Sequence, residues 1–185
     1  HLALGWKADT IRYWLKQKKI KNITITTSVE HKALGTAGAL KFAEPYIQNE
    51  PFLILNGDSL LPNLDFKKLI TAHQTSNSIM TLAITPIESS ARYGTVGFDS
   101  EGKITAFQEK TKRERGWINA GVYIAGYNVF SHIPSDTIQS LETDTFPQLA
   151  SIRQLSAFKA PPPLLDMGTS AGLNRLEKFL SPYET

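Results

Sequence analysis

The sequence predicts an α/β protein whose core is a mixed, mostly parallel sheet. Strand-like apolar runs alternate with stretches of helical periodicity three times within the first 85 residues. This alternation is typical of βαβ units, in which a helix crosses over between parallel strands. One run, Phe52–Leu55, contains no polar residue, as expected of a strand that is covered on both faces. We therefore expect one domain over residues 1–185, with helices packed on a central sheet.

The first fifty residues are expected to form a strand, a helix, a second strand and a second helix. Residues 2–5 end a strand, and residues 8–19 form a helix whose apolar side chains share one face and whose last turn is rich in lysine. Residues 23–27 are largely β-branched, which favours the second strand. A loop then leads into a helix that ends near Pro45, and Thr36 is its expected N-cap.

The strand at Phe52–Leu55 ends abruptly at Asn56-Gly57-Asp58. Gly57 has no Cβ, so the backbone can turn there or a ligand can approach it closely. Asp58 then lies at the carboxyl end of a central strand, where open α/β sheets bind their ligands. A carboxylate in that place suits a hard divalent cation. Asn-Gly-Asp is equally typical of a plain turn, and these three residues alone do not decide between the two interpretations.

The remaining elements continue the α/β pattern and then add an antiparallel part. Asp65 is expected to cap a helix, and residues 79–85 to form a strand. A hairpin over residues 93–109 follows, and then a strand, a short helix, a weak strand and a terminal helix. These last four elements are expected at residues 117–125, from residue 144, at 155–159 and at 170–180.

The composition excludes several classes of protein. There is no cysteine, so the chain can form neither disulfide bonds nor thiolate metal sites. The net charge of +3 and the pI near 9.1 are too mild to indicate nucleic-acid binding. No apolar run approaches the roughly 20 residues that span a bilayer, and no signal peptide is visible. We expect a cytoplasmic protein that binds neither nucleic acid nor membrane.

Six short motifs occur in a fixed order along the chain. They are Leu34-Gly35-Thr36-Ala37-Gly38-Ala39, Leu55-Asn56-Gly57-Asp58, Tyr93-Gly94-Thr95-Val96, Glu109-Lys110, Ile118-Asn119-Ala120-Gly121-Val122-Tyr123 and Asp166-Met167-Gly168-Thr169. Each is weak alone, but the ordered set resembles the sugar-1-phosphate nucleotidyltransferases, which make nucleotide-diphospho-sugars. Within that family it looks most like the guanylyltransferases that act on mannose 1-phosphate or D-glycero-α-D-manno-heptose 1-phosphate. The resemblance implies a three-layer α/β/α sandwich of Rossmann-like type, the nucleotide-diphospho-sugar transferase fold.

The resemblance implies transfer of a nucleotidyl group, GMP from GTP, to a sugar 1-phosphate with release of pyrophosphate. Asp58 and Asp166 would hold Mg²⁺, and Lys110 would place its ammonium group near the sugar phosphate. The matching Asp58 motif favours this role for Asp166 over the alternative, in which Asp166 is the N-cap of the next helix. The product would be a GDP-sugar for glycan, capsule or lipopolysaccharide synthesis. The oligomeric state stays open, a homo-oligomer included.

The resemblance also assigns residues to the two substrates. The nucleotide would be bound by Leu34, Gly35, Thr36, Asn56 and Gly57, and backbone groups of the first three would read the edge of the base. The sugar phosphate would be bound by Gly94, Glu109, Lys110, Asn119 and Gly121. Each assignment has a structural alternative. The alternatives are a loop-to-helix cap at 34–36, a strand-start glycine at Gly94, an exposed ion pair of Glu109 with Lys110, an amide joining two strands at Asn119 and close packing at Gly121.

The chain departs from the family at its start. Members of the family open with a strand, a Gly-rich loop that wraps the triphosphate and a Pro-Lys-Pro segment, and none of these precedes His1. We therefore expect the sequence to be N-terminally incomplete. The missing loop favours an alternative function, a catalytically inactive regulatory subunit that binds a nucleotide-sugar, whereas the presence of both Asp58 and Asp166 argues against it. A glycosyltransferase would need Asp-x-Asp at the strand end, and Asn56-Gly57-Asp58 does not supply it.

Overall fold

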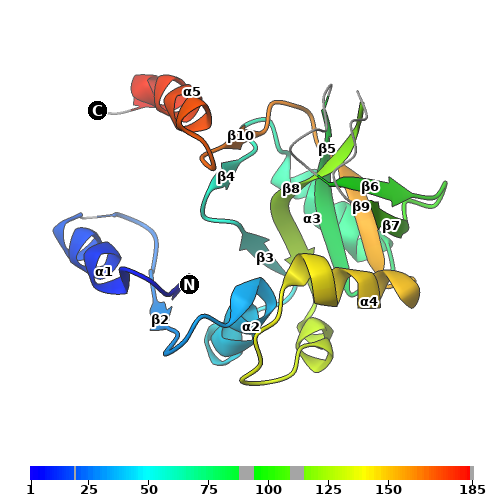
Figure 1. The fold of residues 1–185 in the computed structure, drawn as a ribbon, viewed down its shortest axis with the longest axis horizontal. Coiled ribbons are helices and arrows are strands. Elements are labelled where there is room, and N and C mark those ends of the chain that lie inside the picture. The colour runs from blue at the N-terminus through cyan, green and yellow to red at the C-terminus, as the bar shows by residue number, and fades with distance from the viewer. Residues whose placement is uncertain (19, 88–93, 109–114, 184–185) are drawn as a thin grey trace. The chain divides into compact units, whose positions relative to one another are not determined.

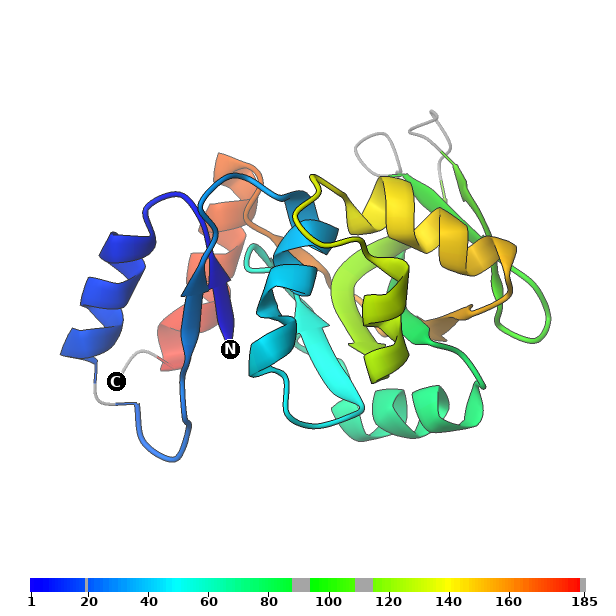
Figure 2. The same ribbon diagram turned by 90° about the horizontal axis from the view of Figure 1, so that it is seen from below.

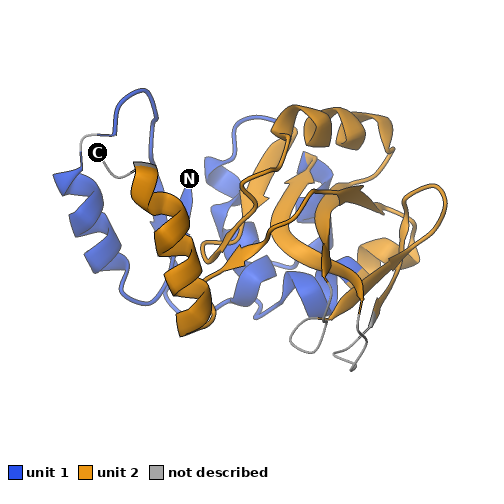
Figure 3. Cartoon of the chain, turned by 90° about the horizontal axis from the view of Figure 1, so that it is seen from above, with its two compact units in different colours: residues 1–50, 127–146 blue, residues 51–126, 147–185 orange. Residues whose placement is uncertain are grey.

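The computed structural model describes residues 1–18, 20–87, 94–108 and 115–183, and its contacts divide the chain into two units. Unit 1 consists of residues 1–50 and 127–146, and unit 2 of residues 51–126 and 147–185 (Figure 3). Unit 1 carries a small two-stranded sheet, whereas unit 2 carries the large sheet (Figure 1).

Unit 1 begins with a small βαβ unit. β1 (Leu2–Leu4) and β2 (Thr27–Val29) are parallel, and α1 (Ala8–Gln17) forms the crossover between them (Figure 2). α2 (Gly35–Ala43) follows and continues into a 3₁₀ turn at Glu44–Tyr46. The predicted order of strand, helix, strand and helix is therefore confirmed for this part of the chain.

The second strand of unit 1 is shorter and later than predicted. Residues 23–26 are not in a strand, and pairing begins only at Thr27. Leu2 N–H donates to the Thr26 carbonyl at 2.9 Å, so the pairing starts where β1 starts. A strand needs a neighbour for its backbone hydrogen bonds, and the β-branched residues before Thr26 have none in β1. The prediction was wrong for these residues because it used side-chain propensity alone.

Residues 127–146 complete unit 1. They contain a 3₁₀ helix (Tyr127–His132) and a π-helical segment (Leu141–Thr145). Ser140 caps the second of these, because its hydroxyl accepts hydrogen bonds from the N–H groups of Glu142 and Thr143 at 3.1 and 3.2 Å. The helical structure predicted from residue 144 therefore begins earlier, at Leu141.

Unit 2 is built on a mixed sheet around β8 (Gly116–Ala125). The other strands of this sheet are β3 (Phe52–Leu55), β5 (Met80–Ile87), β6 (Thr95–Phe98), β7 (Ile104–Gln108) and β9 (Leu155–Lys159). One edge of β8 pairs with β5, and the other edge pairs with β3 and β6. A separate antiparallel pair is formed by β4 (Ser59–Leu60) and β10 (Leu165–Asp166).

The large sheet is mixed, as predicted, but β8 changes how its strands pair. β3, β5, β6 and β9 run in one direction, in agreement with the parallel sheet expected from the βαβ pattern. β8 runs in the opposite direction and lies between β5 on one side and β3 and β6 on the other. Among the described strands of this sheet, β5 and β9 are consequently the only neighbours that pair in parallel. The sequence predicted the strand at 117–125 but not its direction.

Helices cover both faces of this sheet, which gives the predicted α/β/α layers. α3 (Phe66–Thr75) and α4 (Phe146–Ser151) lie on opposite faces (Figure 2). Asp65 caps α3 as predicted, because its carboxylate accepts the Lys68 N–H at 3.1 Å. α5 (Ser170–Leu180) has the predicted bounds. None of the helices in the described part of the chain is long and apolar enough to cross a membrane.

The core beneath α3 is apolar and contains one buried histidine. Leu69 of α3 is fully buried in a cluster that includes Ala83 of β5 and Val122 of β8. His73 lies one turn further along α3 and is only 8% exposed, with Nδ1 3.0 Å from Thr81 Oγ1. Burial lowers the pKa of the His73 imidazole below its ordinary value, because the charged ring would lose its water.

The free energy of unfolding should therefore fall as the pH is lowered below about 6.5, the ordinary pKa of histidine. The unfolded chain binds a proton at His73 in that range, whereas the folded chain resists protonation until the pH reaches its lower pKa. The contribution of neutral His73 to the free energy of unfolding is complete above the pKa that histidine has in the unfolded chain, and it is lost as the pH falls below that value. Urea unfolding at about pH 5.5 and 7.5 would measure the difference. His73→Gln should reduce this difference in the free energy of unfolding between the two pH values. The control His31→Gln, at an exposed position, should not reduce it. An equal pH-dependent difference in the two variants would contradict the prediction.

Candidate functional site

Asn56, Gly57 and Asp58 leave the large sheet at the end of β3. The pairing of β3 with β8 ends one residue earlier, and a further backbone bond runs from Asn56 N–H to the Gly121 carbonyl at 2.8 Å. Gly57 and Asp58 then form a turn that leads into β4. Asp58 therefore stands just beyond the carboxyl end of β3, as the sequence predicts. The prediction that this strand is central and covered on both faces was wrong, because β3 pairs only with β8 among the described strands, and Leu53 and Leu55 are exposed.

The β4–β10 pair brings Asp58 and Asp166 onto neighbouring segments of unit 2. Asp166 lies opposite Ser59, the residue that follows Asp58. The Asp58 carbonyl accepts a hydrogen bond from Met167 N–H at 2.9 Å, which extends the pairing by one residue. Two carboxylates that are more than a hundred positions apart in sequence are thus placed on adjacent, hydrogen-bonded backbone.

The surroundings of the two carboxylates differ. Asp58 is exposed, and its Oδ1 accepts a hydrogen bond from Ser59 Oγ at 3.1 Å. Asp166 is half-buried, and its Oδ1 accepts the Gly168 N–H at 2.7 Å. A carboxylate oxygen has more than one lone pair, so these bonds orient the groups and leave them able to bind a cation.

Thr169, and not Asp166, caps α5. The Thr169 hydroxyl accepts the Gly172 N–H at 3.1 Å, so the alternative interpretation of Asp166 as the N-cap is wrong. Gly172 is also required by packing, because a Cβ at this position would overlap the Asp166 carbonyl. The first turn of α5 therefore lies directly against the backbone of Asp166.

The two aspartates suit a cation that takes few protein ligands. Within the described ranges, no three His, Cys, Asp or Glu side chains gather closely enough to hold a metal ion. Sites for Mg²⁺ bound with phosphates commonly use only one or two carboxylates, and waters and phosphate oxygens supply the other ligands. Asp58 and Asp166 supply that number of carboxylates from two paired backbone segments.

Gly121 occupies an irregular point of β8 next to Asn56. Its φ is +73°, and a Cβ at this position would lie 3.1 Å from Asn56 Cβ and Nδ2. The Asn119 Oδ1 accepts the Gly121 N–H at 3.0 Å, and Asn119 Nδ2 donates to Tyr123 Oη at 2.9 Å. The close packing predicted for Gly121 is observed. The amide of Asn119, however, joins residues of one strand, whereas the structural alternative placed it between two strands.

The other predicted residues of unit 2 differ in what the structure shows. Gly57 is exposed, its φ lies outside the left-handed region, and a Cβ there would meet no atom within 4 Å. The turn itself therefore does not require a glycine. Gly94 is exposed and directly precedes β6. Glu109 and Lys110 lie outside the described residues, as does Tyr93.

Residues 34–36 form the start of α2 in unit 1. Leu34 is 1% exposed; its N–H donates to Glu30 Oε2 at 3.1 Å, and its carbonyl accepts the Gln139 N–H at 2.8 Å. Gly35 has φ +74°, and a Cβ there would overlap the Gln139 carbonyl. Leu34 therefore packs inside the unit, and Gly35 and Thr36 are the exposed part of this segment.

Thr36 does not cap α2, so that prediction was wrong. Leu34 occupies the N-cap position and makes no side-chain cap bond. Thr36 Oγ1 instead accepts the Leu141 N–H at 2.7 Å and donates to Glu142 Oε2 at 2.9 Å. Gln139 and Glu142 were not predicted, because no local pattern in the sequence connects them to a segment that lies more than a hundred positions earlier.

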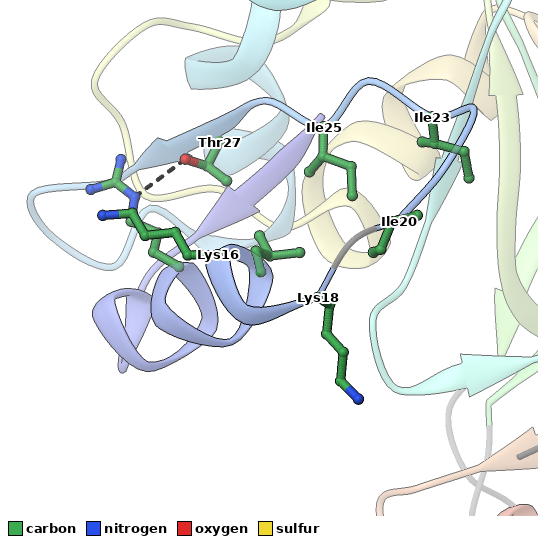
Figure 4. A pocket seen from close by; sticks show the side chains of 8 residues that line it. Lys16, Lys18, Ile20, Ile23, Ile25 and Thr27 are labelled. Carbon is green, nitrogen blue, oxygen red and sulfur yellow. Dashed lines mark hydrogen bonds between the residues drawn. The ribbon is translucent and has the colours of Figure 1, made fainter. Parts of the chain in front are cut away.

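A groove in unit 1 contains none of the predicted site residues. It lies between α1 and residues 20–27 (Figure 4). Its lining consists of Arg12, Leu15, Lys16, Lys18, Ile20, Ile23, Ile25 and Thr27. Arg12 Nε donates to Thr27 Oγ1 at 3.2 Å across the groove. This lining is cationic and apolar and includes no carboxylate, so it does not suit a divalent cation.

The protein belongs to the nucleotidyl transferase family. The family model described as nucleotidyl transferase matches residues 7–180, which is nearly the whole chain. The resemblance inferred from the six motifs is thereby confirmed, and so is the fold that the resemblance implies.

Three relatives show which members of the family the chain is similar to. The D-glycero-α-D-manno-heptose 1-phosphate guanylyltransferase of Aneurinibacillus thermoaerophilus is 30% identical over 98% of this chain and 78% of its own length. The mannose-1-phosphate guanyltransferase 2 of Candida glabrata is 34% identical over 90% of this chain. The crystal structure of HddC from Yersinia pseudotuberculosis in complex with GMP-PN covers 96% of this chain and 77% of its own, with a TM-score of 0.83 and 28% identity. The chain spans 47% of the length of the Candida relative, and thus about half of it.

Gly121→Ala should lower the free energy of unfolding by about 1–3 kcal/mol, the usual cost of holding a non-glycine residue in a sparsely populated backbone region. The added methyl group would also press on Asn56. Gly57→Ala is the matched control, since its Cβ would meet open space, and it should change stability by less than about 0.5 kcal/mol. Denaturant unfolding of both variants checks the prediction, and equal losses would show that the backbone at Gly121 is not strained.

Proposed function

We propose that the protein transfers GMP from GTP to a sugar 1-phosphate of the mannose or manno-heptose type, with formation of a GDP-sugar and release of pyrophosphate. The observation that carries the proposal is the pairing of the Asp58 and Asp166 segments across β4 and β10, in a chain that belongs to the nucleotidyl transferase family. The guanylyltransferase names of its relatives support the choice of base and of sugar.

The reaction joins two anions and needs no covalent nucleophile from the protein. A phosphate oxygen of the sugar 1-phosphate attacks the α-phosphorus of the nucleotide. A new P–O bond forms, and the bond to the bridging oxygen of the β-phosphate breaks. The electron pair leaves with pyrophosphate. The protein must align the two phosphates in line and offset the charge that accumulates on them.

Asp58 and Asp166 are the residues that would hold Mg²⁺. Their carboxylates provide hard oxygen donors, and the Ser59 hydroxyl and the Gly168 N–H each orient one of them from the side. The bound cation would supply neutralisation of the phosphate charge and polarisation of the reacting phosphorus. The exposed turn at Gly57 leaves room beside Asp58 for a phosphate to approach.

The nucleotide would bind at the exposed start of α2. Gly35 and Thr36 present their surfaces there, whereas the polar backbone groups of Leu34 are already bonded within unit 1. We therefore narrow the base-reading role to Gly35 and Thr36 and keep Leu34 as the residue that supports them. The motifs also assign Asn56 and Gly57 of unit 2 to the nucleotide.

The sugar phosphate would bind to residues next to the ends of strands in unit 2. Gly94 precedes β6 and is exposed. Glu109 would accept hydrogen bonds from sugar hydroxyls, and Lys110 would place a cation at the sugar phosphate. These two roles rest on the motif alone.

Asp58→Asn and Asp166→Asn should each lower the rate of pyrophosphate release by at least about a hundredfold, because each removes a charged ligand from the reacting phosphates. The protein, expressed from its full gene, would be incubated with Mg²⁺, each nucleoside triphosphate in turn and a panel of sugar 1-phosphates. The control variant is Glu177→Gln, which removes an exposed carboxylate on α5 and should keep the rate within about twofold.

Three outcomes bear on the proposal. Release with GTP and a manno-configured sugar 1-phosphate, lost in both Asp variants, would support it. Release with another nucleotide would keep the reaction and change the base. No release with any pair, together with tight binding of a nucleotide-sugar, would overturn the catalytic proposal and favour a regulatory subunit.

A further inference from the structure

Asn119 uses both polar groups of its amide within its own strand. Oδ1 accepts the Gly121 N–H at 3.0 Å, and Nδ2 donates to Tyr123 Oη at 2.9 Å. The orientation of the amide follows from chemistry, because a backbone N–H can only donate and must therefore face the oxygen. Asn119 is half-buried, and the Tyr123 side chain is fully buried. The amide thus bridges residues 119, 121 and 123 of β8.

The bridge spans a bulge in β8. Tyr123 pairs with Leu82 of β5, and Asn119 pairs with Ile84, so three residues of β8 (120–122) lie opposite the single residue Ala83 of β5. The two extra residues lie around Gly121, whose φ of +73° marks the point where the strand departs from extended geometry. A bulge of this kind redirects the backbone locally. The Asn119 amide replaces the ladder partner that the bulged Gly121 N–H has lost.

The bulge is bonded to the segment that leads into the turn with Asp58. The Gly121 carbonyl accepts the Asn56 N–H at 2.8 Å, and the Asn56 side chain packs on the Gly121 backbone. Asn56 is two residues from Asp58, whose carbonyl is bonded to Met167 N–H beside Asp166. A continuous set of hydrogen bonds and contacts therefore leads from the Asn119 amide to the candidate metal ligands, all within unit 2.

We infer that Asn119 is a positioning residue, which acts through Gly121 and Asn56 to hold Asp58 in register with Asp166. The inference rests on the proposed function for the meaning of the two carboxylates. It also differs from the motif-based assignment, in which Asn119 contacts the sugar. The two roles predict different effects of the same substitutions.

The test uses Mn²⁺ as a paramagnetic substitute for Mg²⁺, with binding measured by electron paramagnetic resonance in the absence of substrates. Asn119→Ala should weaken Mn²⁺ binding by about tenfold or more, the usual range for loss of a group that orients a ligand. Asn119→Asp keeps an oxygen for the Gly121 N–H and can accept from the Tyr123 hydroxyl, so binding should return to within about threefold of the unsubstituted protein.

A matched variant separates positioning from general loss of stability. Thr81→Val removes the buried hydrogen bond between Thr81 of β5 and His73 of α3. It leaves the Asn119 bridge intact and should leave Mn²⁺ affinity unchanged. Amide hydrogen exchange at Gly121 and Asn56 gives a readout that needs no metal. Exchange at both should speed up by about tenfold or more in Asn119→Ala and much less in Thr81→Val.

The outcomes distinguish failure of the inference from failure of the proposed function. Unchanged Mn²⁺ binding and unchanged exchange in Asn119→Ala, with only a raised KM for the sugar 1-phosphate, would overturn the positioning role and restore the sugar contact. Failure of the unsubstituted protein to bind Mn²⁺ would also overturn it. The predicted changes in binding and exchange, in a protein that releases no pyrophosphate, would support the positioning role and remove the catalytic proposal alone.

Discussion

The hydrogen bond from Asn56 N–H to the Gly121 carbonyl sets the geometry on which the candidate site in unit 2 depends. It is the last backbone bond between the β3 segment and β8, at 2.8 Å, and the turn with Asp58 begins immediately beyond it. On the far side of the turn, Met167 N–H bonds to the Asp58 carbonyl. The backbone at Asp58 is therefore held on both sides, so little backbone conformational entropy would be lost if its carboxylate bound a cation.

The start of α2 in unit 1 is likewise held by backbone hydrogen bonds to a segment that is distant in sequence. The Gln139 carbonyl accepts the N–H groups of Ala37 and Gly38 at 3.0 and 3.3 Å, so it satisfies donors of the first turn that the helix itself leaves open. Thr36 and Glu142 add a polar bond between the same two segments. In both units, then, short glycine-containing segments are held by chain that is distant in sequence.

Local patterns in the sequence predicted most of the elements. The terminal helix and the strand at 155–159 have the predicted bounds, because capping residues and alternation are local signals. The strand at 23–27 was overestimated, since strand formation depends on a partner whose length the sequence does not reveal. The direction of β8 was not predictable for a related reason, because it depends on which neighbours the strand finds.

The candidate site was predictable to a similar extent. The two aspartates were identified from motifs, and their pairing across β4 and β10 was not, because two-residue strands leave no periodic pattern. The same limit applies to Gln139 and Glu142, and to the Asn119 amide, whose partners are defined by the bulge. Side-chain hydrogen bonds of this kind depend on tertiary geometry, and the residue types involved are common in loops and strands.

The contacts of Gly121 with Asn56 and Asn119 limit which amino-acid substitutions the protein can tolerate one at a time. A residue larger than glycine at 121 would be strained and would press on Asn56, and a change at 119 would leave the Gly121 N–H without its acceptor. Single substitutions at these positions therefore pass through destabilised intermediates, so the three residues should be inherited together. A library intended to alter the choice of sugar would therefore keep these three residues constant.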